Sequence, residues 1–262
     1  MSENTTALIT GASTGIGAAY ADRFARRGHN LVLVARNQER LEGVASRLRV
    51  ETGVSVDIVR ADLTDTDDLA VVETRLRDDD RIGILVNNAG FSLPGGFLQQ
   101  SPGDVARLIA LNATAVARLT SAVAPRFADA GSGAIVNISS VVGLAPEFGM
   151  SVYGATKAFV TYLSQGLSLE LGPKGVYVQA VLPAATRTEL WDLAGIDVNT
   201  LTGVMEVDDL VDAALVGFDR REAVTIPPLH EAARWDAHQA ARQAILPDIA
   251  QSKPGERYLA KA

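Results

Sequence analysis

The chain has 262 residues, 47% hydrophobic and 21% charged, which is typical of a soluble globular protein with one substantial α/β domain. Its formal net charge of −7 argues against broad nucleic-acid binding, which requires a basic face. The absence of cysteine excludes disulfides, thiolate catalysis and cysteine-ligated metals.

The first predicted element is a short apolar strand at residues 6–10. It leads into a turn with glycines at 11, 15 and 17 and then into a helix with Ile16, Tyr20 and Phe24 on one face. Glycines at a strand-to-helix turn let the backbone approach a diphosphate, whose charge then meets the helix N-terminus. This context favours a phosphate site over a glycine-rich turn without a ligand.

Strands and helices alternate along the rest of the chain. Apolar runs predict strands at 31–35, 54–60, 82–86, 134–139, 176–182 and 223–226. Helical spacing predicts helices at 37–51, 65–77, 102–128, 152–171 and 207–218. This alternation predicts an α/β fold with a Rossmann-like, doubly wound parallel sheet flanked by helices. We expect a single domain over 1–262, with a C-terminal helical tail from about 229.

The predicted strand at 31–35 ends in Ala35 and Arg36. Enzymes that use NAD carry an acid near the end of this strand, whereas NADP enzymes place a cation near the additional phosphate. The missing acid and the arginine therefore favour NADPH, the alternative being an exposed arginine that opens the next helix.

Tyr153 and Lys157 are four positions apart on a predicted helix and lie one turn from each other. A nearby ammonium favours the phenolate and should lower the tyrosine pKa, as carbonyl reduction or alcohol oxidation requires. Ser140 follows the predicted strand at 134–139, so its hydroxyl is expected to reach the same oxygen. The alternative is a packed tyrosine with an ordinary exposed lysine.

Six motifs occur in a characteristic order: Thr10-Gly-Ala-Ser-Thr-Gly-Ile-Gly17, Asp62-Leu63, Asn87-Asn-Ala-Gly90, Asn112, Ile138-Ser-Ser140 and Tyr153-Gly-Ala-Thr-Lys157. In these motifs the chain resembles the short-chain dehydrogenase/reductase family, in its single-domain, NADP-dependent type. The resemblance implies catalytic roles for Asn112, Ser140, Tyr153 and Lys157. It implies cofactor contacts at Gly11, Ser13, Thr14, Gly15, Ile16, Gly17, Arg36, Asp62, Leu63, Asn88, Ala89, Gly90, Tyr153, Lys157, Pro183 and Thr188.

The resemblance gives Asn112 a role in proton exchange, and the chain departs from the family's usual residue at Ala184. By resemblance Asn112 holds a water that connects Lys157 to solvent, the alternative being an exposed helix asparagine. Ala184 stands where the family most often has glycine, and alanine resists the positive φ that glycine permits.

The expected function is hydride transfer between NADP(H) and a carbonyl/alcohol pair; the alternative is a catalytically silent NADP-binding redox sensor or regulator. A variable segment at about 186–205 should cover a partly apolar substrate, near Leu93, Glu147, Phe148 and Trp191.

The dispersed histidines predict no metal. By resemblance we expect a homodimer or homotetramer packed through the two long helices. A polar start and the lack of an apolar run of membrane-spanning length predict a cytoplasmic protein without membrane contact.

Overall fold

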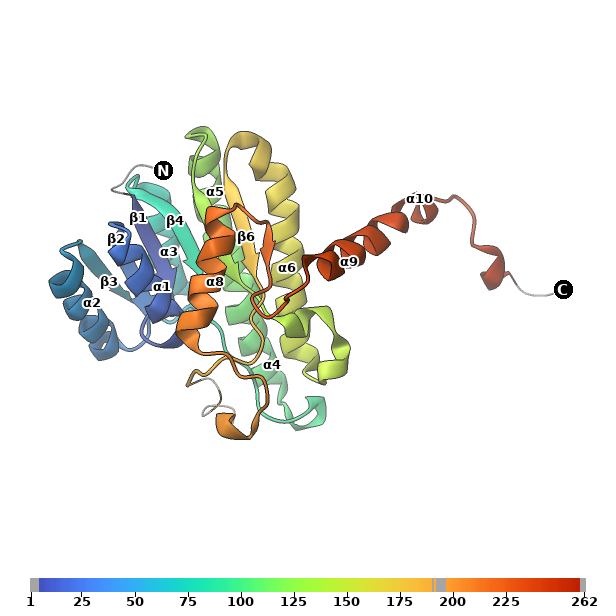
Figure 1. Ribbon diagram of the computed structural model, residues 1–262, viewed down its shortest axis with the longest axis horizontal. Coiled ribbons are helices and arrows are strands. Elements are labelled where there is room, and N and C mark those ends of the chain that lie inside the picture. The colour runs from blue at the N-terminus through green and yellow to red at the C-terminus, as the bar shows by residue number, and fades with distance from the viewer. Residues whose placement is uncertain (1–4, 190, 192–196, 260–262) are drawn as a thin grey trace. The chain divides into compact units, whose positions relative to one another are not determined.

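The computed structural model describes residues 5–189, 191 and 197–259 (Figure 1). The chain divides into two units, Met1–Pro227 and Pro228–Ala262. The parallel sheet and the helices that flank it all belong to the first unit.

The first unit is built on a seven-stranded sheet in the order β3-β2-β1-β4-β5-β6-β7. All of the strand pairs are parallel, and the order reverses between β1 and β4. In such a sheet a ligand binds outside the carboxyl ends of the strands, at this reversal. The predicted doubly wound fold is thereby confirmed. The strands are β1 Thr6–Thr10, β2 Asn30–Ala35, β3 Val56–Arg60, β4 Ile82–Asn87, β5 Ala134–Ile138, β6 Tyr177–Val181 and β7 Val224–Thr225.

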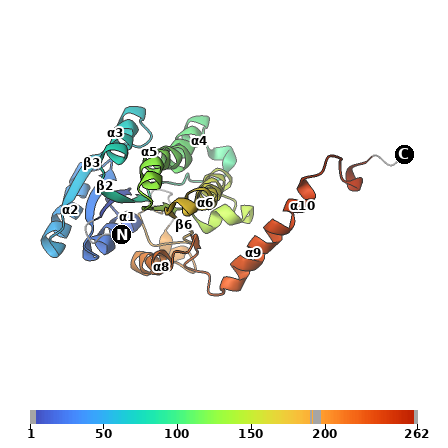
Figure 2. The ribbon, with the colours of Figure 1, turned by 90° about the horizontal axis from the view of Figure 1, so that it is seen from above.

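Helices cover both faces of the sheet (Figure 2). One buried apolar cluster joins the sheet to α1, α2 and α8, and a second joins it to α3, α5 and α6. The central strands β1 and β5 are buried along their whole length, which is why they appear in the sequence as mostly apolar runs. These helices are α1 Gly15–Arg26, α2 Gln38–Thr52, α3 Thr66–Asp78, α4 Pro102–Ile109, α5 Val116–Asp129, α6 Ser151–Leu171 and α8 Val207–Asp219.

The long helix predicted at 102–128 is interrupted. A π-helical segment, Ala110–Ala115, lies between α4 and α5, and no sequence signal indicated it. Among the described residues, one continuous helical stretch, Pro102–Asp129, is long enough and apolar enough to cross a membrane by length and composition alone. This finding is contrary to our expectation that no apolar run reaches membrane-spanning length. Core helices of soluble proteins pass the same test, and this helix packs against α3 and α6, so the finding is weak evidence for a span.

In its described part, the second unit contains two α-helices, α9 Ala232–Ala244 and α10 Leu246–Ile249, and a short 3-10 helix, Glu256–Tyr258. Trp235 and His238 stack on α9 with ring centroids 5.2 Å apart. Neither α-helix buries a residue, so the apolar side chains of this unit contribute little to a core.

Candidate functional site

Lys157 and Tyr153 lie in the N-terminal half of α6. The lysine is only 5% exposed, and its Nζ donates a hydrogen bond to the Ile138 carbonyl at 2.9 Å. The same Nζ is 5.6 Å from the centroid of the Tyr153 ring. The alternative of an ordinary exposed lysine is therefore wrong, because the fold buries this ammonium between α6 and the end of β5.

Ser140 meets this pair from the sheet, two residues after β5 ends. Its side chain is buried, accepts a hydrogen bond from the Val142 N–H at 3.2 Å and donates one to the Pro183 carbonyl at 3.3 Å. It also hydrogen-bonds the Tyr153 phenol. The structure thus brings together the serine, tyrosine and lysine that the sequence singled out.

The electrostatics of the pair differ from the expectation. Burial raises the pKa of Tyr153 to about 12, although the Ser140 hydrogen bond acts to lower it. Burial also lowers the pKa of Lys157 to about 8. The expected lowering of the tyrosine pKa by the ammonium does not appear in the protein by itself, because loss of hydration penalises both charged forms.

Asn112 lies in the π-helical segment and is only 1% exposed, so it is not an exposed helix asparagine. Its Nδ2 donates to the Phe91 carbonyl at 2.9 Å and its Oδ1 accepts from the Phe91 N–H at 3.1 Å. Nδ2 also donates to Thr156 Oγ1, at 3.3 Å. The side chain therefore ties the long helix both to the segment after β4 and to α6.

Two glycines, Gly143 and Gly154, allow the turn that follows Ser140 to pack closely on α6. A Cβ at Gly143 would lie 2.7 Å from the Ala158 nitrogen and the Lys157 carbonyl carbon, closer than real Cβ atoms come. A Cβ at Gly154 would lie 3.1 Å from the Val142 carbonyl oxygen. The short helix Val141–Leu144 therefore packs directly on the backbone of α6. The glycine between Tyr153 and Lys157 was the only local signal of this contact.

The glycine turn after β1 leaves little room for side chains. Gly11 and Gly15 adopt φ of 66° and 54°, and a Cβ at Gly17 would clash with the Gly11 carbonyl. Thr14 makes no side-chain cap to α1, and the first turn contains no acid. The first N–H groups of α1 therefore suit a diphosphate, so the residues present fit a dinucleotide.

The predicted cofactor residues Ser13 and Ile16 belong to this same turn and to the start of α1. Gly17 itself is explained by packing within the protein, since its Cβ would also meet the Asn88 side chain. Its role is thus to let α1 approach the turn closely.

Asp62 and Arg36 lie together near the carboxyl ends of β2 and β3. Burial acts to raise the pKa of Asp62, but hydrogen bonds from Thr64 and the charges of Arg36 and Arg107 lower it below its ordinary value. Leu63, beside it, is buried. Arg107, whose guanidinium lies 5.7 Å from the Phe91 ring centroid, was not foreseen because it comes from a helix far along the chain.

Asn88, Ala89 and Gly90 connect the glycine turn to the lysine. Asn88 Nδ2 donates to the Thr10 carbonyl at 2.9 Å, and Thr10 Oγ1 accepts from the Asn88 and Ala89 N–H groups. A Cβ at Gly90 would lie 3.2 Å from Asn112 Oδ1 and 3.6 Å from Lys157 Nζ. The motif therefore packs between the glycine turn and the buried ammonium of Lys157.

The segment after β6 approaches both halves of the site. The Pro183 carbonyl accepts the Val141 N–H at 2.9 Å, next to Ser140. The Thr188 methyl lies 3.3 Å from where a Cβ on Gly15 would stand. Ala184 does not adopt a positive φ, so alanine is accommodated here without strain.

The segment expected to cover the substrate is tied down at its base. Thr186 and Met205 form an isolated parallel bridge, and Trp191 Nε1 donates to the Thr186 carbonyl at 2.7 Å. Residues 190 and 192–196 of the predicted covering segment lie outside the described residues.

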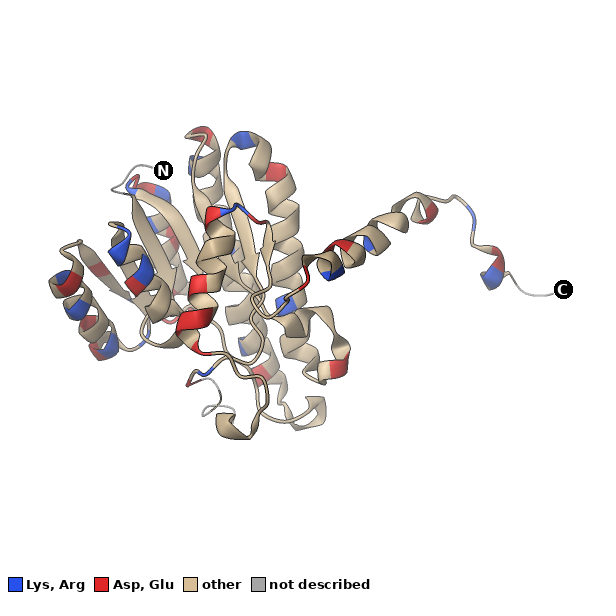
Figure 3. Cartoon of the chain, in the orientation of Figure 1, with Lys and Arg blue, Asp and Glu red and all other residues tan. Residues whose placement is uncertain are grey.

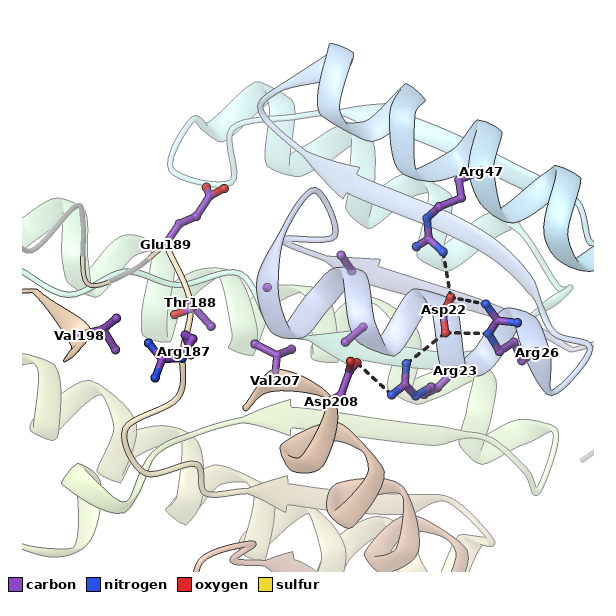
Figure 4. A pocket seen from close by; sticks show the side chains of 13 residues that line it. Asp22, Arg23, Arg26, Arg47, Arg187, Thr188, Glu189, Val198, Val207 and Asp208 are labelled. Atoms are coloured by element: carbon purple, nitrogen blue, oxygen red, sulfur yellow. Dashed lines mark hydrogen bonds and ion pairs between the residues drawn. The ribbon is translucent and has the colours of Figure 1, made fainter. Parts of the chain in front are cut away.

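A cleft of about 800 Å³ runs along the outer face of α1 from Gly15 towards α8 (Figure 4). It is lined by the Asp22 carboxylate, which hydrogen-bonds Arg23, Arg26 and Arg47 and has a pKa lowered to about 2, although burial opposes the shift. None of the proposed catalytic residues lines this cleft. In the described part of the chain, no group of three or more His, Asp or Glu side chains is arranged to hold a metal.

Solved structures of bacterial enzymes resemble the chain over nearly its whole length. A short-chain dehydrogenase from Sphingobium yanoikuyae in complex with NADPH is 69% identical, with a TM-score of 0.96 over 97% of this chain and 100% of that one. A bulky-bulky ketone specific alcohol dehydrogenase from Comamonas testosteroni is 62% identical, with a TM-score of 0.92 over 98% and 100% of the two chains.

Curated relatives are more distant. A very-long-chain 3-oxoacyl-CoA reductase-B from Danio rerio is 38% identical over 188 residues, which are 70% of this chain. The chain spans about 60% of the length of that relative and of several like it. The human 17-beta-hydroxysteroid dehydrogenase type 3 is 37% identical over 80% of this chain and 68% of its own. The family model for short chain dehydrogenase matches residues 5–197. With its parallel sheet and its buried serine, tyrosine and lysine, the chain belongs to the short-chain dehydrogenase family.

Proposed function

We propose that this protein is an NADP(H)-dependent oxidoreductase that interconverts a ketone or aldehyde and the corresponding alcohol. The observation that carries the proposal is the convergence of Ser140, Tyr153 and Lys157 beyond the carboxyl ends of the strands. Together with the glycine turn, these residues fit a dinucleotide and a small carbonyl substrate. When bound, the nicotinamide supplies or accepts the hydride.

In the reducing direction, the Ser140 and Tyr153 hydroxyls hold the carbonyl oxygen. The Tyr153 phenol donates its proton to that oxygen as the carbonyl carbon receives the hydride. A phenol with a raised pKa is fully protonated at neutral pH, and its partial exposure leaves it accessible to substrate. In the oxidising direction the phenolate accepts the alcohol proton.

Lys157 has two proposed tasks. Its ammonium stabilises the phenolate that proton transfer leaves behind, and it binds the nicotinamide ribose. Asn112, whose Oδ1 lies near the same glycine as Lys157 Nζ, is proposed to support a water that returns the proton from solvent.

The proposed cofactor preference rests on Arg36. Its charge acts on Asp62, and the position before it is Ala35, so a 2′-phosphate would meet a guanidinium and no acid at the end of β2. A relative at 69% identity binds NADPH, which supports the same preference here. Pro183 and Thr188 are proposed to bind the nicotinamide half, whereas the glycine turn is proposed to bind the diphosphate.

For the substrate we propose a ketone with a bulky group on each side of the carbonyl, because the relative at 62% identity is specific for such ketones. We also propose a homo-oligomer in the cytoplasm, with residues 1–262 as one cofactor-binding domain and its helical tail. The lack of cysteine is compatible with a reducing compartment.

The decisive experiment follows NADPH oxidation at its near-ultraviolet absorbance with a panel of bulky ketones. We expect turnover with a higher kcat/KM for NADPH than for NADH. The Tyr153→Phe variant should keep its NADPH affinity but lose about 10²- to 10⁴-fold in kcat, because its proton donor is gone. Near-normal turnover in the variant would contradict the role of Tyr153. Binding of NADPH without turnover of any carbonyl by the unmodified protein would support the regulator instead.

A further inference from the structure

A long-range ion pair joins two segments on either side of the proposed path of the dinucleotide, which runs from the glycine turn to Arg36. Arg40 Nη1 and Glu189 Oε2 are 2.6 Å apart, although the two residues are separated by 149 positions in sequence. Arg40 lies in the first turn of α2, where its backbone N–H donates to the capping side chain of Asn37 at 2.9 Å. The guanidinium therefore extends from a helix start that follows directly on Arg36.

The neighbours of Glu189 show where this bridge passes. The Thr188 methyl lies 3.3 Å from where a Cβ on Gly15 would stand, at the start of α1, and Glu189 pairs with Arg40 at the start of α2. In a Rossmann-type fold the diphosphate lies at the helix after the first strand and the adenosine ribose at the end of the second strand. On the function proposed above, the segment 188–189 and its ion pair thus cross the path between these two subsites.

The pair is separate from the charged cluster on the outer face of α1. Figure 4 shows Glu189 well separated from Asp22 and its arginines, which pair with one another. Among the described residues, the ion pair that Glu189 makes is the one with Arg40. Both side chains are about half exposed, so water and salt reach the bridge.

We propose that Arg40 and Glu189 form a strap across the path of the dinucleotide, and that this strap opens each time the dinucleotide enters or leaves. The strap joins two protein groups, so breaking it removes no contact with the dinucleotide. Its loss lowers the barrier to passage in both directions, and the association and dissociation rate constants rise by the same factor. The equilibrium Kd stays unchanged.

The test is a double-mutant cycle with Arg40→Gln, Glu189→Gln and the double variant. NADPH association and dissociation are followed by stopped-flow fluorescence. Because an exposed ion pair contributes at most about 1 kcal/mol, we expect both rate constants to increase about 2- to 5-fold in each single variant. The double variant should show the same increase. NADH should show the same factors, because the strap does not read the phosphate. Raising the salt from about 0.05 M to about 0.5 M should bring the unmodified protein close to the variants.

The Arg27–Asp219 pair is a matched control, since it is an exposed long-range pair at the opposite end of α1, with a 2.8 Å contact. Arg27→Gln should leave both rate constants unchanged. The strap is overturned if Arg40→Gln and Glu189→Gln leave the rates as they are. It is also overturned if Arg40→Gln weakens NADPH alone while Glu189→Gln tightens it, since Arg40 would then bind the 2′-phosphate in competition with Glu189. An unmodified protein that binds no NADPH would contradict the proposed function, and the strap with it.

Discussion

Among single residues, Lys157 shows most directly how the site is obtained at a cost in stability. The residue is 5% exposed and its ammonium donates a hydrogen bond to the Ile138 carbonyl, so most of its hydration is lost on folding. Burial consequently lowers its pKa from 10.5 to about 8. A residue selected for folding alone would not be a lysine here, because an apolar side chain of similar size avoids this desolvation.

The pH dependence of stability follows from that shift. Between pH 8 and 10.5 the unfolded chain binds more protons at Lys157 than the folded protein, so this residue makes the free energy of unfolding rise with pH. Below pH 8 the free-energy cost of burying the charged lysine is present in full. In Lys157→Met this cost is absent at every pH. We therefore expect the stability of the unmodified protein relative to the variant to increase by about 3 kcal/mol from pH 7.5 to pH 10.5.

Urea unfolding of both proteins across this range measures the difference. Lys174→Met is the control, since it removes an exposed lysine from the short helix Gly172–Lys174 that follows α6. A difference between the Lys157→Met variant and the unmodified protein that is constant with pH would show that Lys157 does not titrate as the structure indicates.

At the scale of elements, the site depends on how closely the turn after β5 packs on α6. Gly143 permits contact with the backbone at Lys157 and Ala158, and this contact sets the distance between Ser140 and Tyr153. The proposed chemistry requires both hydroxyls on one oxygen, so a small displacement of the turn is costly.

We expect Gly143→Ala to lower kcat at least about 10-fold, because its methyl group must push the turn away from α6. NADPH affinity should change little. Gly166→Ala is the matched control; Gly166 lies on α6 itself, where an added methyl meets nothing within 4 Å. The control should keep full activity and gain up to about 1 kcal/mol in stability. Steady-state kinetics and urea unfolding measure both effects, and equal activity of the two variants would show that this packing does not position Ser140.

For the whole molecule, α6 has an outer face suited to another copy of the chain. Phe159, Tyr162 and Leu169 recur on one side of the helix and are 43%, 79% and 80% exposed. Figure 3 shows few charges along this helix, and its sequence contains only Lys157 and Glu170. An exposed apolar face of this kind supports the proposed homo-oligomer.

We expect Tyr162→Glu combined with Leu169→Glu to lower the mass measured by light scattering, because four charges would be buried in a symmetric dimer interface. Val50→Glu is the control, since Val50 is 87% exposed on α2, and it should leave the mass unchanged. An unchanged mass in the double variant would place the interface elsewhere or show that the protein is a monomer.

The sequence by itself determined the features that depend on local spacing. Apolar runs and helical periodicity predicted the seven strands and a parallel sheet flanked by helices, because each element must bury a face of its own. The four-residue spacing placed Tyr153 and Lys157 one turn apart. Only the tertiary structure decided how distant segments meet. The π-helical turn at Asn112, the contact of Gly143 with α6 and the pairing of Arg40 with Glu189 all depend on packing between segments far apart in the chain. The pKa directions of Tyr153 and Lys157 belong to the same class, because they are set by how much water the folded chain removes from each group.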